Sequence, residues 1–197
     1  RIHYLISVDP LTAVSTETKQ IESQIEELTR SWPDELSTLL QDRHGEHEGL
    51  ARADEWSEGF PTAFREEFSP AQGVDDLVHV IMADAEAHLK IALHQPDGYA
   101  AHQAQLRLYS PGAAIVLSDV LPVIENLGLH VLTENPFRIR SESGRVVFLH
   151  LFDLADRDGQ DIQISKSKTD FENLFQRIWR GNNDNDGFNR LALRAQL

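Results

Sequence analysis

Apolar residues recur at helical spacing through most of the first third of the chain. The spacing predicts a helix from Thr16, with apolar residues at steps of four and three: Ile21, Ile25, Leu28 and Trp32. Pro33 is expected to bend or restart this helix, and a further helical segment runs through Trp56. Ser69-Pro70 then opens another helix with these residues inward: Val74, Leu77, Val78 and Ile81. The first third is therefore predicted to be mainly helical.

Beyond these helices the hydrophobic pattern changes to a period of two. Leu89, Ile91 and Leu93 alternate with more polar residues, and Leu106 and Leu108 repeat the pattern after a loop. Each segment therefore reads as a half-buried strand, and we expect the two to pair as an antiparallel hairpin. Residues 1–8 alternate in the same way and are predicted to form a strand.

The segment LSDVLPVIENLGLHVLTENPFRI, residues 117–139, combines a helix and a strand in few residues. Ser118 or Asp119 is expected to cap a short amphipathic helix, with Pro122 in its first turn if Asp119 is the cap. Gly128 can adopt the left-handed conformation that ends the helix. A strand follows to Ile139, and after a turn a second, central strand is predicted over residues 145–154.

The last regular element predicted with a clear face is a helix after the central strand. Its apolar stripe is Phe171, Leu174, Phe175, Ile178 and Trp179. Thr169 or Asp170 is expected to cap it, and Gly181 to end it. A polar turn and a short helical segment complete the chain.

The order strand, helix, strand, strand, helix matches most of the split βαβ (ferredoxin-like) plan, which lacks only its last strand here. The chain after Trp179 offers no good strand, whereas residues 89–93 form a hairpin on the edge where that strand belongs. We therefore predict an α+β fold, in which a helical segment precedes a four-stranded antiparallel sheet and residues 89–93 fill the vacant place.

Composition narrows the classes of partner. The chain of 197 residues has a formal net charge of −14, which disfavours partners held through phosphates, so neither nucleic acid nor an anionic membrane surface is expected. It contains no cysteine, which suits a cytoplasmic location and excludes thiolate chemistry. No apolar run is long enough to span a bilayer. The first residue is Arg1, so we expect the chain to begin within a longer protein.

Several polar clusters resemble sites, but each has a simpler interpretation. The turn HGEHEG carries metal-capable side chains without a closed ligand set, so no metal site is assigned. The loop from Asn182 imitates the start of a calcium loop, but its twelfth position is Leu193. His150 lies in an apolar strand and is interpreted as a hydrogen-bonded core histidine. No residue is assigned a catalytic role.

Residues 112–139 resemble the hallmark segment of the large bacterial NAD-specific glutamate dehydrogenases, where a similar sequence marks an ACT-like regulatory domain. Residues 32–61 resemble that family's upstream helical motif. Residues 171–193 resemble the stretch that leads towards its catalytic domain. The resemblance implies that residues 87–181 form the ACT-like domain. It also implies an end strand of an upstream domain at 1–15, a helical motif at 16–86, and the start of a linker to the catalytic domain at 182–197.

The resemblance implies an enzyme of amino-acid catabolism that converts L-glutamate, water and NAD to 2-oxoglutarate, ammonium and NADH. The residues indicate that this part does not bind the cofactor, because no two of its 11 glycines are spaced as G-x-G. The four lysines Lys19, Lys90, Lys166 and Lys168 are scattered over polar stretches, where solvated surface side chains are expected. We therefore expect NAD and the active site to belong to the full-length enzyme.

ACT domains often bind amino-acid effectors at the loop after their first strand, where helix amides can hold a carboxylate. In this chain the candidate effector-binding residues are Gly112, Leu117, Ser118 and Asp119. The competing interpretation is that the loop is a simple connection and that the domain positions the subunits of a homo-oligomer. A third is a free-standing ACT-type amino-acid-binding or oligomerisation module without an enzyme.

Overall fold

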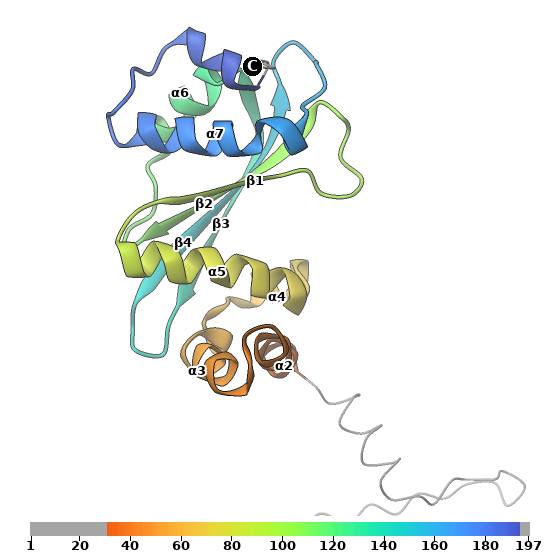
Figure 1. Ribbon diagram of the computed structural model, residues 1–197, viewed down its shortest axis with the longest axis vertical. Helices are drawn as coiled ribbons and strands as arrows, with labels where there is room; N and C mark the ends of the chain where they lie inside the picture. Colours follow the sequence, from red (N-terminus) through yellow and green to blue (C-terminus); the bar gives the residue numbers. More distant parts are fainter. Residues whose placement is uncertain (1–30, 194–197) are drawn as a thin grey trace, which may run out of the picture.

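The computed structural model describes residues 31–193 of the chain (Figure 1). The strand predicted over residues 1–8 and the helical turns predicted over residues 16–30 lie outside this range. The helices are α2 (Trp32–His44), α3 (Glu46–Trp56), α4 (Thr62–Glu67), α5 (Pro70–Glu86), α6 (Leu117–Asn126) and α7 (Ile164–Trp179). The strands are β1 (Lys90–His94), β2 (Gln103–Pro111), β3 (Leu129–Arg140) and β4 (Val146–Asp156). Two short 3-10 helices are η1 (Ser57–Gly59) and η2 (Gly187–Leu193).

The four strands form one antiparallel sheet in the order β1-β2-β4-β3. Strand β1 pairs with β2 from Lys90 opposite Tyr109 to His94 opposite Gln105. This confirms the hairpin and shows that β1 occupies the place of the missing last strand of the split βαβ plan. Strand β4 is central, as its continuous apolar run predicted. The α+β fold class is confirmed.

Helices cover both faces of the sheet. Figure 1 shows α6 and α7 on one face, and α5 with α4, α3 and α2 on the other. Each face has its own hydrophobic core, which mixes helix and strand residues. In β2, Leu106 and Leu108 belong to the core under α6 and α7, whereas Tyr109 belongs to the core under the helical layer. Because successive side chains of a strand point to opposite faces of the sheet, one strand contributes residues to both cores.

A bulge in β3 lets this edge strand contribute to both cores. The register with β4 shifts between Val131 and Thr133. Before the shift, Leu129 belongs to the core under α6 and α7; after it, Phe137 and Ile139 belong to the other core. With strict alternation these odd-numbered residues would all face one side, so the extra residue is what switches the face.

Helices α2 and α5 begin with the same local device. Ser31 and Ser69 each accept a bond from the backbone amide three residues on, Asp34 or Gln72, whose side chain accepts in return from the cap residue's amide. A proline follows each cap, at a position where its missing amide hydrogen is not needed. A helix therefore begins at Trp32, beside Pro33, and the predicted opening by Ser69-Pro70 is confirmed.

The buried face of α5 differs slightly from the predicted one. Val74 and Leu77 are buried as expected, but Val78 and Ile81 are only half-buried. The remaining buried residues of this helix are Gly73, Asp76, Val80 and Ala83. The observed buried face of α5 is thus rotated about the helix axis relative to the predicted face. A pattern of apolar residues cannot predict this rotation, because it does not count a small or charged residue that packs inward.

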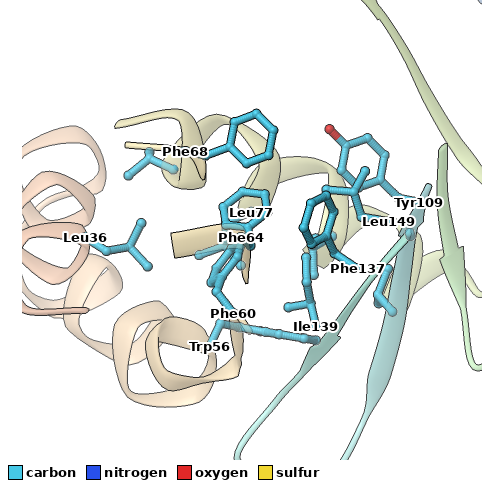
Figure 2. Packing of buried hydrophobic residues seen from close by; sticks show 14 of the residues in the cluster. Leu36, Trp56, Phe60, Phe64, Phe68, Leu77, Tyr109, Phe137, Ile139 and Leu149 are labelled. Carbon is cyan, nitrogen blue, oxygen red and sulfur yellow. The ribbon is translucent and has the colours of Figure 1, made fainter. Parts of the chain in front are cut away.

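Aromatic side chains join the helical layer to the sheet (Figure 2). Phe64 of α4 packs edge-on against Phe137 of β3, with ring centroids 5.4 Å apart and planes at 90°. Phe60 and Phe68 also pack against Phe64 with tilted rings, whose centroids lie 4.9 and 4.7 Å from that of Phe64. The sequence pattern showed only a break at Phe60-Pro61 and missed α4. This single short helix places the aromatic residues between the longer helices and the strands.

Helix α7 corrects a predicted start. Thr169 and Asp170 were expected to cap it, but it begins at Ile164 and its N-cap residue, Gln163, makes no side-chain capping bond. The polar residues of the first turn are accommodated because the Ser167 hydroxyl donates to the backbone carbonyl of Gln163 at 2.9 Å. The predicted end is confirmed, since Gly181 has a positive φ of 72° just after the helix.

Candidate functional site

The loop between β2 and α6 holds the predicted effector-binding residues. Gly112 has a positive φ of 77°, and its amide donates to the carbonyl of Val146 at 2.8 Å. A side chain at Gly112 would meet no heavy atom within 4 Å, so glycine is needed here for its backbone conformation and not for space. The loop therefore begins as a tight, hydrogen-bonded turn beside β4.

His150 fixes the middle of this loop from below. It is 3% exposed. The amide of Ile115 donates to its Nε2 at 3.0 Å, so Nε2 carries the lone pair and Nδ1 carries the hydrogen. Nδ1 then donates to the carboxylate of Glu134 on β3 at 2.8 Å. The interpretation of His150 as a hydrogen-bonded core histidine is confirmed, and it ties the loop to the edge strand.

The predicted cap of α6 is wrong. The helix begins at Leu117 with Val116 as N-cap, and no side chain caps it. The Ser118 hydroxyl donates to the Asp119 carboxylate at 3.3 Å. Because the helix starts two residues earlier than Asp119, Pro122 lies inside it and not in its first turn. The predicted stop is confirmed, since Gly128 has a φ of 87°.

All four predicted residues thus lie on one exposed segment, with Leu117 41% exposed. Without a side-chain cap, the first amides of α6 are open to a carboxylate or to water. Asp119, in the first turn, opposes an anion there. Among the described residues, the Ser118 hydroxyl bonds to the exposed carboxylate of its sequence neighbour Asp119 and not to a histidine. The arrangement fits binding or connection, not covalent chemistry.

A second polar cluster, which the sequence did not reveal, lies between α5 and the sheet. Asp76 is 1% exposed and accepts from Arg107 Nη1 and from the Tyr109 hydroxyl, each at 2.5 Å. Arg107 Nε donates to Gln105 at 2.9 Å, and its guanidinium lies 5.0 Å from the ring centre of Phe68. A charged pair is therefore buried exactly where α5 crosses β2, and each partner is hydrogen-bonded.

The cluster continues across the sheet to its edge. Gln105 donates to the Tyr99 hydroxyl at 3.1 Å and to Asp153 at 3.3 Å. Tyr99 also donates to Asp153 at 2.5 Å, and Thr133 of β3 donates to the other oxygen of Asp153 at 2.5 Å. Hydrogen bonds thus connect α5, β2, β4 and β3. Such a network fixes the relative position of these elements.

Burial dominates the electrostatics of this cluster. It raises the pKa of Asp76, against the opposing effects of Arg107 and Tyr109. It also raises the pKa of Tyr109 well above its usual range, and raises that of Tyr99 to about 12. His94, at the end of β1, has its pKa lowered to about 4, first by burial and then by Lys168. Both tyrosines and His94 are therefore uncharged near neutral pH.

A cavity of about 210 Å³ opens beside the cluster. Its walls come from α5, from the end of β1 with the loop that follows it, and from β2. The main polar side chains that line it are Asp76, His79, His94, Gln105, Arg107 and Tyr109. Their sequence signal was weak, because polar residues that alternate with Leu106 and Leu108 also suit a solvated strand face.

Metal and membrane sites gain no support from the described residues. Within residues 31–193, no three histidine, aspartate or glutamate side chains form a group that could hold a metal ion. The residues HGEHEG, predicted as a polar turn, are mainly helical, because α2 ends at His44 and α3 begins at Glu46, with Gly45 alone between them. The His44 ring contacts Arg52 at 3.2 Å. Among the helices of the same range, none has both the length and the apolar character of a membrane span.

The structure is a split βαβ (ferredoxin-like) sheet with a layer of helices on its second face (Figure 1). Residues 88–167 match the ACT3 domain of glutamate dehydrogenase, and residues 39–82 match helical motif 2 of the same family. The chain therefore belongs to the glutamate dehydrogenase family, of which it carries these two regions.

Individual relatives agree with the family assignment. The chain is 34% identical over all 197 residues to the NAD-specific glutamate dehydrogenase of Pseudomonas aeruginosa, and 33% identical to that of Halomonas elongata. It is 25% identical over 183 residues to that of Mycobacterium tuberculosis. It spans 12% of the length of each of the first two relatives and 11% of the third.

Proposed function

We propose that this chain is a non-catalytic regulatory or assembly region of an NAD-specific glutamate dehydrogenase. The full-length enzyme would convert L-glutamate, water and NAD to 2-oxoglutarate, ammonium and NADH in the cytoplasm. The observation that carries the proposal is similarity over the whole chain to enzymes so named, of which it spans 12%. The absence of any G-x-G pair in the sequence supports a location of the NAD site elsewhere.

The packing favours an assembly role for the two regions together. The helical motif and the sheet share one buried core. Large apolar side chains remain on the surface of the opposite layer, including Val116 at 58%, Leu117 at 41% and Phe188 at 80% exposed. Exposed apolar residues of this size suit contacts with another part of the enzyme or with another subunit of a homo-oligomer.

Effector binding is the second candidate function. Its support is the uncapped start of α6 beside Gly112, Leu117 and Ser118, where backbone amides can hold an amino-acid carboxylate. Asp119 weakens the case by its charge. We therefore place assembly first and amino-acid sensing second.

The test of the main proposal uses the purified 197-residue chain and the full-length protein that contains it. We expect the chain to form no NADH from L-glutamate and NAD, and the full-length protein to form it. NADH formation by the chain would overturn the non-catalytic proposal. A reading frame that stops directly after Leu197 would instead favour the free-standing ACT-type module.

Calorimetric titration with amino acids addresses the second candidate. Binding at the loop should be lost in Gly112→Ala, which strains a positive φ, and kept in Gly98→Ala, whose φ of 89° lies in another loop. No heat with any amino acid, or an equal loss in both variants, would argue against sensing at this loop.

A further inference from the structure

The cavity beside α5 lies apart from the loop before α6. Tyr109 and Arg107 line it from the middle of β2, and His94 and Gln95 line it from the end of β1. Because β1 and β2 are antiparallel, His94 lies opposite Gln105, near the start of β2, whereas the loop follows the end of β2. The two places are therefore separate on the sheet.

Arg107 brings an unused donor to this cavity. Its Nη1 is bonded to Asp76 and its Nε to Gln105, and the guanidinium also interacts with the Tyr109 side chain. Within residues 31–193, no hydrogen bond is assigned to its Nη2. Among those residues no buried side-chain nitrogen or oxygen lacks a partner. Nη2 must therefore reach open space, and the cavity is the open space that Arg107 lines. A charged N–H group in that position favours an acceptor with a negative charge.

Two imidazoles add further hydrogen-bonding groups. His94 makes no side-chain hydrogen bond within residues 31–193 and is uncharged near neutral pH, so it offers one donor and one acceptor. His79 stacks on Tyr109, with ring centroids 5.0 Å apart, and its Nδ1 donates to the Asp75 carbonyl at 3.2 Å. Its Nε2 is the ring nitrogen left for a ligand.

The local charge favours an anion although the chain is acidic overall. Each acidic residue at the cavity has an arginine partner: Arg107 pairs with Asp76 at 2.5 Å and Arg43 with Asp75 at 2.6 Å. After burial, Lys168 and Arg107 contribute most to lowering the pKa of His94, ahead of His79, and Asp75 opposes them. Glu172, which accepts from the Leu93 amide, lies 3.8 Å from Lys168. The two strongest of the charges that act on His94 are cations, and they favour an anionic ligand there.

We propose that this cavity binds a small carboxylate, held by Arg107 Nη2 and the His94 imidazole. A volume of about 210 Å³ suits a ligand of amino-acid size. Arg107 already forms one ion pair, with Asp76, and a planar ligand carboxylate can accept a hydrogen bond from its remaining nitrogen. A phosphate dianion would need more donors and more positive charge. This inference is independent of the proposed function.

Proton uptake should accompany binding. An anion beside His94 stabilises the protonated ring and so raises the pKa of His94. The charges of Lys168, Arg107 and His79 oppose this increase, and Asp75 supports it. The affinity for the carboxylate is therefore expected to rise as the pH falls from about 7 to about 5.

The test titrates the 197-residue chain with acetate, L-glutamate and inorganic phosphate in a calorimeter, at about pH 5 and about pH 7. We expect saturable binding of a carboxylate, weakened about tenfold in His94→Leu by the lost hydrogen bond. His130→Leu, on the exposed side of β3, is the matched control and should bind as the wild type does.

A measurement on the wild type guards against a variant that fails to fold. In NMR spectra, the carboxylate should shift the His94 imidazole signals and raise the pKa of His94 above about 4, while the His130 signals do not respond. The proposal is overturned if neither carboxylate binds at either pH, if only phosphate binds, or if binding leaves the His94 signals unchanged. Equal affinity in a folded His94→Leu variant would also overturn it.

Discussion

Asp75 and Asp76 are neighbours in sequence but have opposite surroundings. The Asp75 side chain is 68% exposed and pairs with Arg43 on the surface. The Asp76 side chain is 2% exposed and pairs with Arg107, whose side chain is 9% exposed. Surface pairs contribute little to stability, whereas removal of one partner from a buried pair leaves a desolvated charge. The two positions therefore offer a matched comparison.

Asp76→Asn should lower the free energy of unfolding by about 3 to 5 kcal/mol, because Arg107 would remain buried without its counter-charge. Asp75→Asn should change it by at most about 1 kcal/mol. Urea unfolding of both variants at neutral pH measures the difference. Similar midpoints for the two variants would mean that water reaches Arg107 and replaces the lost charge.

No sequence pattern indicated this buried pair. Arg107 lies between Leu106 and Leu108, and such alternation is typical of a strand with one solvated face. The interpretation of one solvated face is wrong, because the helical layer, formed by residues earlier in the chain, covers that face of the sheet. The predicted loop residues Gly112, Leu117, Ser118 and Asp119 do lie together, since they are close in sequence. Contacts between distant segments, such as Asp76 with Arg107, required the tertiary structure.

At the scale of elements, the turn between β3 and β4 is held against α3. The Glu142 amide donates to the Glu55 carbonyl at 2.8 Å, and the Ser143 hydroxyl donates to the Glu55 carboxylate at 2.5 Å. Arg145 pairs with the same carboxylate at 2.8 Å and also with Asp84 of α5. The Ser143 hydrogen bond, followed by that of Arg145, lowers the pKa of Glu55 from 4.5 to about 2.

This shift predicts an acid-dependent contribution from Glu55. Because its pKa is lower in the folded chain, the stabilisation is complete above about pH 4.5 and is lost as the pH falls towards about 2. Glu55→Gln should therefore cost roughly 1 kcal/mol at neutral pH, and less at about pH 3. Urea unfolding at both pH values checks this.

Glu142→Gln is the control, because Glu142 is exposed in the same turn and contacts Glu55 through its backbone amide. Its effect should be small at both pH values. A pH-independent cost of Glu55→Gln would show that the charge of Glu55 does not hold the turn.

The strands and long helices could be predicted because each carries a regular apolar pattern. Helix starts were harder. Ser118 and Asp119 have the right chemistry for a cap, but Ile115 is bonded to His150 and brings the chain into helical conformation earlier. Helix α4, only Thr62–Glu67, is too short for a repeating pattern, and its position depends on Phe64 reaching Phe137.

At the scale of the whole molecule, the helical motif and the sheet are joined by a shared core. Phe64 is 0% exposed and touches Phe137 of β3 as well as Phe60 and Phe68. Neither layer can bury its aromatic face without the other. The two regions recognised as separate family domains should therefore unfold together.

Phe64→Ala should lower the free energy of unfolding by about 3 to 5 kcal/mol, because it leaves a cavity in this shared core. Tryptophan fluorescence and far-ultraviolet circular dichroism should still report one coincident transition. Two separated transitions, with the helices lost before the strands, would contradict a single cooperative unit. Leu50→Ala is a suitable control, since Leu50 is 45% exposed and should change stability little.

The shared core also has a consequence for synthesis on the ribosome. Phe64 emerges roughly 70 residues before its partner Phe137, and at about 5 to 20 residues per second the delay is roughly 4 to 14 s. During that interval the aromatic face of the helical motif has no sheet to cover it. The nascent chain therefore presents a hydrophobic surface that a chaperone could recognise, and that surface disappears once β3 and β4 have paired.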